Sequence, residues 1–432
     1  MSPVRKPVLP PETIGILGGG QLGRMMAQEA RRMGYGIVVL DPSDDCPASH
    51  LADEHIQAEF SDANAVQKLA AASSALTFEF ENVDPAVMEG LESFPSLEPL
   101  FVSRNRWREK SLARKLGIAT APFFPVNSVT DLRMACANPE IQACGGAILK
   151  TCEGGYDGKG QWRLKPEQLE AAAGPLSDSD FVGLLESDLR DLLSATTGPP
   201  AASQRSESER APGNAPVLTA GTSEVVADSA PFLLEGMVDF SLEFSIVGTG
   251  FSDGSFHCYP PIENQHRDGI LHKSLSSSNL DEVASRRAVE YARSLSEHFG
   301  YIGTFAVEFF LAEGEPVFNE MAPRPHNSGH LTMDAKLSSQ FEQHIRAICG
   351  LPPGPNSSLC EAAMINLLGE DNSQLRGLED AIGIPGLRFH WYGKKEARSG
   401  RKMGHITAIH SDLSEAERAV EKAFQCLGWV RQ

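Results

Sequence analysis

Two glutamates in the segment AVEFFLAEGEPVFNE could together bind a metal ion. Glu308 and Glu320 are each six residues from Gly314, and apolar runs flank an expected turn at Glu313 and Gly314. In an antiparallel hairpin, residues at opposed positions project to one face with their Cβ atoms ~5 Å apart. Carboxylates this close repel unless a cation lies between them, and such hard oxygen ligands suit Mg²⁺. We therefore predict a magnesium site to which Asn319 could add an oxygen; two exposed acids on a surface strand are the alternative.

A polar loop follows this hairpin and contains Arg324, His326, Asn327, Ser328 and His330 among prolines and glycines. Solvated loops are often polar. A dense run of these residue types beside an expected metal site nevertheless indicates a site for an anionic, hydroxylated ligand.

A basic cluster in WYGKKEARSGRKMGH contains Lys394, Arg401 and Lys402. The chain has a formal net charge of −19, from 38 basic and 57 acidic residues. In so acidic a protein, a local group of cations is a candidate phosphate-binding site. A solvated basic patch is the alternative.

The segment LKTCEGGYDGKGQ carries glycines at 154, 155, 158 and 160, after a strand that ends in Lys150. It is not a Walker A loop, because Lys159 precedes a glycine and the chain continues as QWRL. A glycine loop between strands suits a flap whose backbone N–H groups close over a polyphosphate. Lys150 would then point at the same phosphates. A surface hairpin with a bulge is the alternative.

The segment GILGGGQLGRM fits G-x-G-x-x-G at Gly18, Gly20 and Gly23, and Asp41 ends the next apolar run. One interpretation places the pyrophosphate of a dinucleotide at a helix N-terminus. The other is a tight strand-to-helix turn in a Rossmann-like domain, since an isolated fingerprint is a weak signal. This segment by itself leaves both interpretations open.

The elements that must position these residues alternate between strand and helix from Thr13 onward: strand 13–18, helix 21–34, strand 35–41, helix 65–72 and strand 75–80. This alternation predicts a parallel, doubly wound sheet. A helix of mixed charge at 106–116 leads into a second domain, and 231–248 is expected to form a pair of strands. Residues 195–229 are rich in Ser, Pro, Ala and Gly, which predicts a disordered insertion.

Composition excludes several classes of protein. The negative net charge argues against broad binding to nucleic acid or to an anionic membrane. The eight cysteines are scattered without a C-x-x-C pair, so neither disulfides nor a zinc site are expected. No segment approaches the ~18 apolar residues of a membrane span, and the N-terminus has no apolar signal region. We expect a cytoplasmic protein with no nucleic-acid or membrane partner.

Taken together and in order, these segments resemble the ATP-grasp superfamily and, within it, the 5-(carboxyamino)imidazole ribonucleotide synthase family. The resemblance covers nearly the whole chain and rests on GGGQLGRM, LKTCEGGYDGKGQ, LEGMVDFSLEFS, ENQHRDGIL, VEFF, NEMAPRPHNSGH, SQFEQH and GRKMGH. It implies a mixed α/β and α+β architecture: an ATP-grasp fold preceded by a Rossmann-like domain and followed by a small C-terminal domain. The expected domains are 11–105 (Rossmann-like), 106–238 (ATP-grasp lid, with the insertion), 239–355 (ATP-grasp catalytic) and 356–432 (C-terminal).

The resemblance also implies an activity. It is that of an ATP-dependent carbon–nitrogen ligase, which carboxylates 5-aminoimidazole ribonucleotide with bicarbonate, through carboxyphosphate, in de novo purine biosynthesis. ATP and Mg²⁺ are the implied cofactors, a homodimer is the implied assembly, and a downstream mutase is a further implied partner. GGGQLGRM would then shape the substrate end of the cleft rather than hold a dinucleotide.

Site residues follow from the resemblance position by position. The residues with implied catalytic roles are Lys150, Arg324 and His326. The implied magnesium ligands are Glu308 and Glu320. The implied ATP-binding residues are Arg106, Lys150, Gly155, Tyr156, Asp157, Gly158, Lys159, Gly160, Gln161, Glu235, Gly236, Met237, Val238, Glu243, His266, Asn319 and Glu320. The implied substrate-binding residues are Tyr156, Asp157, Lys159, Arg324, His326, Asn327, Ser328, Lys394, Arg401 and Lys402.

The chain departs from the family pattern in two places. The family's glycine loop often has Arg at the position of Lys159, and the insertion at 195–229 has no counterpart. Three alternatives stay open: another ATP-grasp ligase such as a formate-using transformylase, a nucleotide-sensing member without turnover, and a dinucleotide-dependent oxidoreductase. The acceptor of the substrate's proton, His326 or the phosphate leaving group, also stays open.

Overall fold

The computed structural model describes residues 6–154, 160–185, 187, 189–190, 230–276 and 279–431. The chain divides into two compact units, which are described separately below. Unit 1 consists of residues 1–105, 109–120 and 239–432, and unit 2 of residues 106–108 and 121–238. The insertion predicted at 195–229 lies outside the described residues.

Unit 1 begins with a parallel sheet of strand order β3-β2-β1-β4. Its strands are β1 (Thr13–Leu17), β2 (Gly36–Asp41), β3 (Glu54–Gln57) and β4 (Ala75–Phe78). The accompanying helices are α1 (Gln21–Arg32), η1 (Ser49–Leu51), α2 (Ala63–Ala71), η2 (Pro85–Met88) and α3 (Leu97–Ser103). The predicted parallel α/β arrangement is confirmed. Because the strand order reverses between β1 and β4, their carboxyl ends form a topological switch point, where open α/β sheets bind ligands.

The second sheet of unit 1 joins nine strands in the described residues, in the order β14-β13-β9-β11-β12-β15-β18-β17, with β10 added to β9. The strands are β9 (Leu242–Gly250), β10 (Phe256–Cys258), β11 (Ile262–Arg267), β12 (Ile270–Leu275), β13 (Gly303–Ala312), β14 (Glu315–Ala322), β15 (Glu361–Leu368), β17 (Leu387–Trp391) and β18 (Lys402–His410). A small separate sheet pairs β16 (Ser373–Arg376) with β19 (Gly428–Arg431). The segment expected as a C-terminal domain therefore continues the large sheet through β15, β18 and β17.

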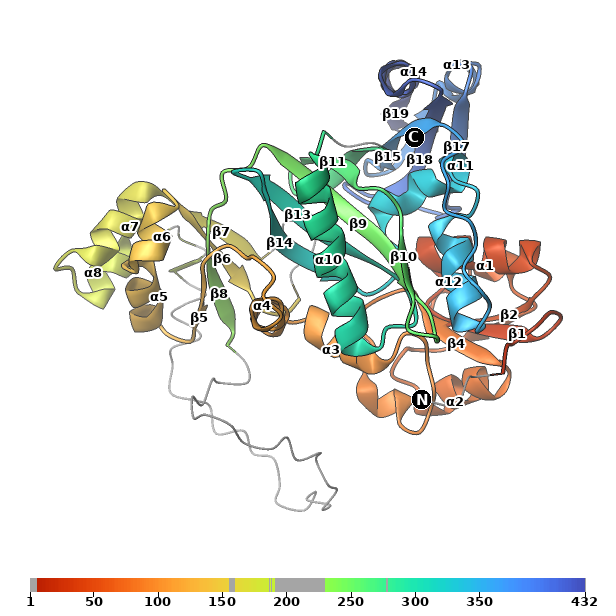
Figure 1. The fold of residues 1–432 in the computed structure, drawn as a ribbon, viewed down its shortest axis with the longest axis horizontal. Helices are drawn as coiled ribbons and strands as arrows, with labels where there is room; N and C mark the ends of the chain where they lie inside the picture. Colours follow the sequence, from red (N-terminus) through yellow and green to blue (C-terminus); the bar gives the residue numbers. More distant parts are fainter. Residues whose placement is uncertain are drawn as a thin grey trace. The chain divides into compact units, whose positions relative to one another are not determined.

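The helices of this part of unit 1 are α4 (Arg106–Lys115, whose first turn belongs to unit 2), α10 (Glu282–Phe299), η3 (Asn327–Leu331), α11 (Thr332–Ala335), α12 (Gln340–Ile348), α13 (Leu378–Ile382) and α14 (Leu413–Cys426). Helix α10 lies across β9 and β13 (Figure 1). Its N-cap is Asp281, whose side chain accepts hydrogen bonds from two backbone N–H groups, and its C-cap is Gly300, with a left-handed φ of 53°. Ala284, Ala288 and Ala292 recur at helical spacing and are buried, which lets the helix approach the sheet closely.

One hydrophobic core joins the N-terminal sheet to the large sheet within unit 1. Helix α1 contributes Met25 and Met26, and α12 contributes Phe341 and Ile345 to the same buried cluster. The carboxyl ends of β1 and β4 and the loop after β14 are therefore held in fixed relation by apolar packing.

Unit 2 is built on an antiparallel sheet of order β5-β8-β6-β7. Its elements are β5 (Phe123–Val126), α5 (Val129–Cys136), α6 (Pro139–Ala143), β6 (Ala147–Thr151), β7 (Gln161–Leu164), α7 (Pro166–Ala173), α8 (Asp178–Gly183) and β8 (Phe232–Gly236). The pairing expected within 231–248 is wrong. Strand β8 pairs with β5 and β6 of unit 2, whereas β9 pairs with β11 and β13 of unit 1.

Within the described part of the chain, no helix combines the length and the apolar character required to span a bilayer.

Candidate active site

The β13–β14 hairpin has the register expected from the sequence. Glu308 pairs directly with Glu320, and the turn residues Glu313 and Gly314 have φ values of 51° and 81°. The register then shifts between Glu308 and Phe309, so that Asn319 is an extra residue on β14. In a β-bulge, two residues of one strand face one residue of the other, which brings Asn319 and Glu320 opposite Glu308.

The electrostatics of this pair fit a bound cation. Burial, and next the charge of Glu320, raise the pKa of Glu308 to about 7, while His266 and Lys402 oppose the rise. Among the residues that the structure describes, no cluster of three or more His, Cys, Asp or Glu side chains could hold a metal ion. Two carboxylates with a neighbouring amide suit Mg²⁺, which commonly takes its other ligands from water and phosphates.

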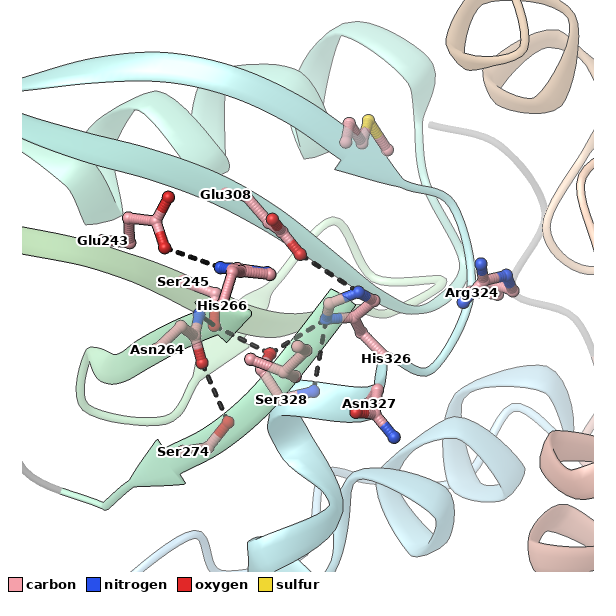
Figure 2. A network of polar contacts seen from close by, with 12 residues as sticks. Glu243, Ser245, Asn264, His266, Ser274, Glu308, Arg324, His326, Asn327 and Ser328 are labelled. Carbon is pink, nitrogen blue, oxygen red and sulfur yellow. Dashed lines mark hydrogen bonds and ion pairs between the residues drawn. The ribbon is translucent and has the colours of Figure 1, made fainter. Parts of the chain in front are cut away.

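A carboxylate–imidazole pair, Glu243 and His266, lies on the adjacent strands β9 and β11 (Figure 2). The Nδ1 atom of His266 is 2.6 Å from Oε2 of Glu243. Burial opposes protonation of His266, but the hydrogen bond to Glu243 and the charge of Glu308 outweigh it and raise the His266 pKa. This pair therefore favours a positive charge beside the carboxylates of the hairpin.

His326 connects the loop after β14 to the hairpin. Its Nε2 atom lies 3.1 Å from Oε1 of Glu308. A dashed line marks this contact in Figure 2. Burial, together with the positive charges of Arg324 and Lys402, lowers the pKa of His326 well below its ordinary value. The imidazole is therefore neutral at pH 7, in contrast to His266.

A pocket of about 370 Å³ in unit 1 gathers cationic side chains from segments far apart in the sequence. Of the predicted substrate-binding residues, those that line it are Arg324, His326, Asn327, Lys394, Arg401 and Lys402. Ser328 does not line it, because its side chain is fully buried beneath the loop. Tyr156, Asp157 and Lys159 lie outside the described residues. The pocket thus unites the polar loop and the C-terminal basic cluster, as an anionic ligand would require.

Local contacts hold the cations of this pocket in place. Arg324 forms an ion pair of 2.6 Å with Glu81, and Nζ of Lys394 lies 2.8 Å from Oε1 of Gln21. Burial, and next the charge of Arg401, lower the pKa of Lys394 to about 8.

Asn327 exchanges two amide hydrogen bonds with Asn366 of β15, which fixes η3 on the large sheet.

The sequence analysis missed part of this pocket. Glu79, Phe80 and Glu81 follow β4 directly, and together with Gln21 and Leu22 they form its other wall. The available signal was the position of two acids at the carboxyl end of a parallel strand, where such sheets bind ligands.

The glycine fingerprint encloses a carboxylate of the chain itself. The N–H groups of Gly20 and Gly23 donate to the two Glu79 oxygens at 2.5 and 2.7 Å, and that of Gly19 donates to Asp41 at 2.8 Å. A Cβ atom at Gly23 would overlap the carbonyl oxygen of Gly18. The glycines are thus explained by a tight turn around Glu79, whose carboxylate occupies the helix N-terminus where a pyrophosphate would bind.

The predicted ATP-binding residues fall in both units. In unit 2, Nζ of Lys150 lies 2.5 Å from Oε2 of Glu235, and both side chains are buried. Gly236 ends β8, and Met237 and Val238 follow it. Gly160 precedes β7, Gln161 is the first residue of β7, and Arg106 begins α4. In unit 1 lie Glu243, His266, Asn319 and Glu320. Residues 155–159 of the glycine loop are outside the described residues.

Comparisons with known proteins follow the same division of the chain. Three family models match: a ribonucleotide synthetase preATP-grasp domain at 12–100, an ATP-grasp domain at 215–341 and a phosphoribosylaminoimidazole carboxylase C-terminal domain at 362–419. The N5-carboxyaminoimidazole ribonucleotide synthase of Bacillus subtilis (strain 168) is 36% identical over 414 residues, which cover 94% of each chain. The chain belongs to the N5-carboxyaminoimidazole ribonucleotide synthase family.

Solved structures of this family agree. The synthetase from Staphylococcus aureus complexed with ADP superposes with a TM-score of 0.77 at 31% identity, covering 97% of this chain and 99% of that one. The Aspergillus clavatus synthase in complex with ADP and 5-aminoimidazole ribonucleotide has a TM-score of 0.74 at 26% identity, covering 96% and 98%. The chain is therefore an ATP-grasp ligase, and the names of these relatives favour neither an oxidoreductase nor a formate-using ligase.

Proposed function

We propose that the chain carboxylates 5-aminoimidazole ribonucleotide to N5-carboxyaminoimidazole ribonucleotide with ATP and bicarbonate, releasing ADP and phosphate, in purine biosynthesis. Family membership supports the ligase activity. The structural observation that carries the proposal is the pocket in which Arg324, Lys394 and Arg401 converge beside His326, which itself contacts Glu308. This arrangement suits an anionic ribonucleotide next to a phosphate-transfer site.

The first step is the activation of bicarbonate. An oxygen of bicarbonate bonds to the γ-phosphorus of ATP while the bond to the bridging oxygen of ADP breaks, which gives carboxyphosphate. Such transfers depend on positioning the reactants and neutralising spread negative charge. We assign this work to Lys150, oriented by Glu235, and to the glycine loop that follows. Glu308 and Glu320, with Asn319, would hold Mg²⁺, which supplies further neutralisation of the phosphates when bound.

The second step is carboxyl transfer. The exocyclic amine of the ribonucleotide bonds to the carboxyl carbon, and the bond from that carbon to the phosphate oxygen breaks. The proton that the amine loses passes to a base, for which the departing phosphate and His326 are the two candidates. Arg324, Lys394, Arg401 and Lys402 would hold the ribonucleotide phosphate and the departing phosphate through charge-assisted hydrogen bonds. Carboxyphosphate reacts with water, so a closed site favours productive transfer.

The testing experiment is ADP release from purified protein with Mg-ATP and bicarbonate, with and without 5-aminoimidazole ribonucleotide. We expect release that requires bicarbonate and is strongly stimulated by the ribonucleotide. Release that ignores the ribonucleotide but responds to formate or to another amine would overturn the substrate assignment. Bound ATP with no release under any condition would indicate a nucleotide sensor.

We also infer a cytoplasmic homodimer that supplies its product to a mutase. All eight cysteines are free thiols, in keeping with a reducing compartment. Sedimentation equilibrium of the purified protein tests the assembly. A single-chain mass at micromolar concentration would contradict the dimer.

A further inference from the structure

A continuous chain of buried polar groups runs across the large sheet to His326 (Figure 2). Ser274 Oγ donates to Oδ1 of Asn264 at 2.9 Å, and Nδ2 of Asn264 donates to Oγ of Ser245 at 3.1 Å. Ser245 Oγ donates to Oγ of Ser328 at 2.8 Å, and that hydroxyl lies 2.9 Å from Nδ1 of His326. We call Ser274, Asn264, Ser245 and Ser328 the serine–asparagine chain.

The register of the sheet places these residues side by side. Asn264 on β11 pairs with Ser274 on β12, and Ser245 on β9 pairs with Glu308 on β13. The three serines are fully buried and Asn264 is nearly so. Because water does not reach these side chains, each of their donors and acceptors must find its hydrogen-bond partner within the protein.

The contacts of His326 determine which group donates and which accepts along the serine–asparagine chain. The backbone N–H of Ser328 points to Nδ1 of His326 at 3.3 Å, and an N–H group can only donate. Nδ1 must therefore accept. In a neutral imidazole the other nitrogen carries the proton, so Nε2–H donates to Glu308.

That direction then passes from one group to the next. The Ser328 hydroxyl gives its single proton to Nδ1, so it must accept from Ser245. Ser245 has then used its proton and must accept from the amide of Asn264, whose oxygen accepts from Ser274. The reverse direction would place an N–H on Nδ1 against the N–H of Ser328.

We propose that Ser245, Asn264 and Ser328 are positioning residues that hold His326 as the Nε2–H tautomer, so that its imidazole donates to Glu308 instead of accepting the substrate's proton. Neither ring nitrogen then has a lone pair available as a base. The departing phosphate takes the amine proton. The tautomer itself does not depend on the proposed function; only this consequence for proton transfer does.

The direct test is the tautomer of His326 in the full-length protein. With ¹⁵N-labelled histidine, long-range ¹H–¹⁵N correlation spectra distinguish the two neutral tautomers, and a His326→Gln variant identifies the signals. We expect a single Nε2–H pattern. An Nδ1–H pattern, or an averaged pattern from exchanging tautomers, would overturn the proposal even if the enzyme assay behaved as expected.

Variants test whether the serine–asparagine chain holds His326 as the Nε2–H tautomer. Asn264→Asp replaces the donating amide with a carboxylate of the same shape, so Ser245 turns its proton toward residue 264 and stops donating to Ser328. Ser328→Ala removes the hydroxyl that donates to Nδ1. In both variants the longer contact from the Ser328 backbone N–H, at 3.3 Å, is left to favour the Nε2–H form without a hydroxyl fixed as a donor, so we expect mixed tautomers at His326. We also expect kcat to fall ~10–100-fold, the usual effect of replacing residues that orient a reacting or ligating group, with little change in KM for the ribonucleotide.

The matched control is Thr249→Val on the same strand, β9. The hydroxyl of Thr249 is buried and bonds to Thr304 at 2.8 Å, outside the serine–asparagine chain. We expect this variant to lose some stability and to keep the wild-type tautomer and kcat. The proposal would be overturned if Thr249→Val changed the tautomer of His326 as strongly as Asn264→Asp, or if Asn264→Asp left that tautomer unchanged. The serine–asparagine chain would then serve packing alone.

Discussion

Glu308 and Glu320 occupy directly opposed positions on β13 and β14, and the bulge leaves Asn319 as an extra residue next to Glu320 in β14. Burial of Glu308 and the charge of Glu320 make this arrangement unfavourable while both acids are ionised. A cation between them removes the conflict. These properties support the proposal that the hairpin holds the magnesium ion of the phosphate transfer.

The first prediction concerns turnover. Glu320→Ala should lower kcat by at least ~10²-fold, because charge stabilisation of the phosphoryl transfer is lost. The control is Glu315→Gln on the same strand, which removes only an exposed ion pair with Arg287 and should change kcat little. ADP-release kinetics on both variants provide the measurement. Near-normal activity of Glu320→Ala would refute the metal assignment.

The second prediction concerns stability in the absence of metal. The pKa of Glu308 is about 7 when folded, above its ordinary value of 4.5, so the folded state binds more protons than the unfolded state between these pH values. The free energy of unfolding should therefore decrease as pH rises from about 4.5 to 7. Glu308→Gln lacks this ionisation and should be more stable than wild type above pH 7, by roughly 1–3 kcal/mol.

Urea unfolding in EDTA at pH 5 and pH 8 measures this difference. The greater free energy of unfolding of Glu308→Gln should shrink toward pH 5. When Mg-ATP is added at pH 8, wild type should become the more stable protein, since only wild type keeps both carboxylates. An advantage of equal size at both pH values would show that Glu308 ionises normally.

The third prediction concerns the pH dependence of substrate binding. Burial lowers the pKa of Lys394 to about 8, so its positive charge is present below that pH and is lost as pH rises through it. KM for the ribonucleotide should rise above pH 8. In Lys394→Arg the guanidinium stays charged, and the rise should disappear. KM measured from pH 7 to 9.5 for both proteins is the test, and parallel curves would exclude Lys394 as the group responsible.

The fourth prediction concerns the glycine turn. Glu79→Gln replaces an acceptor for the N–H groups of Gly20 and Gly23 with an amide that can accept at only one of them. The free energy of unfolding should decrease by about 1–3 kcal/mol.

Wild type should show no binding of NADH by fluorescence, because Glu79 fills the anion position. Micromolar NADH binding to wild type would contradict this interpretation of the fingerprint.

Several features of the fold could be predicted because they depend on local sequence. The β13–β14 register follows from one turn at Glu313 and Gly314, and the parallel N-terminal sheet follows from alternating strand and helix patterns. The resemblance to the ligase family likewise rests on short segments read in order. In each case neighbouring residues carry the information, since turn geometry and side-chain periodicity act over a few residues.

The rest depended on tertiary structure. The strands of 231–248 enter different sheets, and no local pattern specifies which partner a strand takes. Glu81 meets Arg324, and Gln21 meets Lys394, only because the shared core of α1 and α12 brings the two sheets of unit 1 together. By itself, the sequence determined which residue types and local turns the site contains. Packing between distant segments decided which of them meet, and it placed Ser328 beneath the pocket, in the serine–asparagine chain that orients His326.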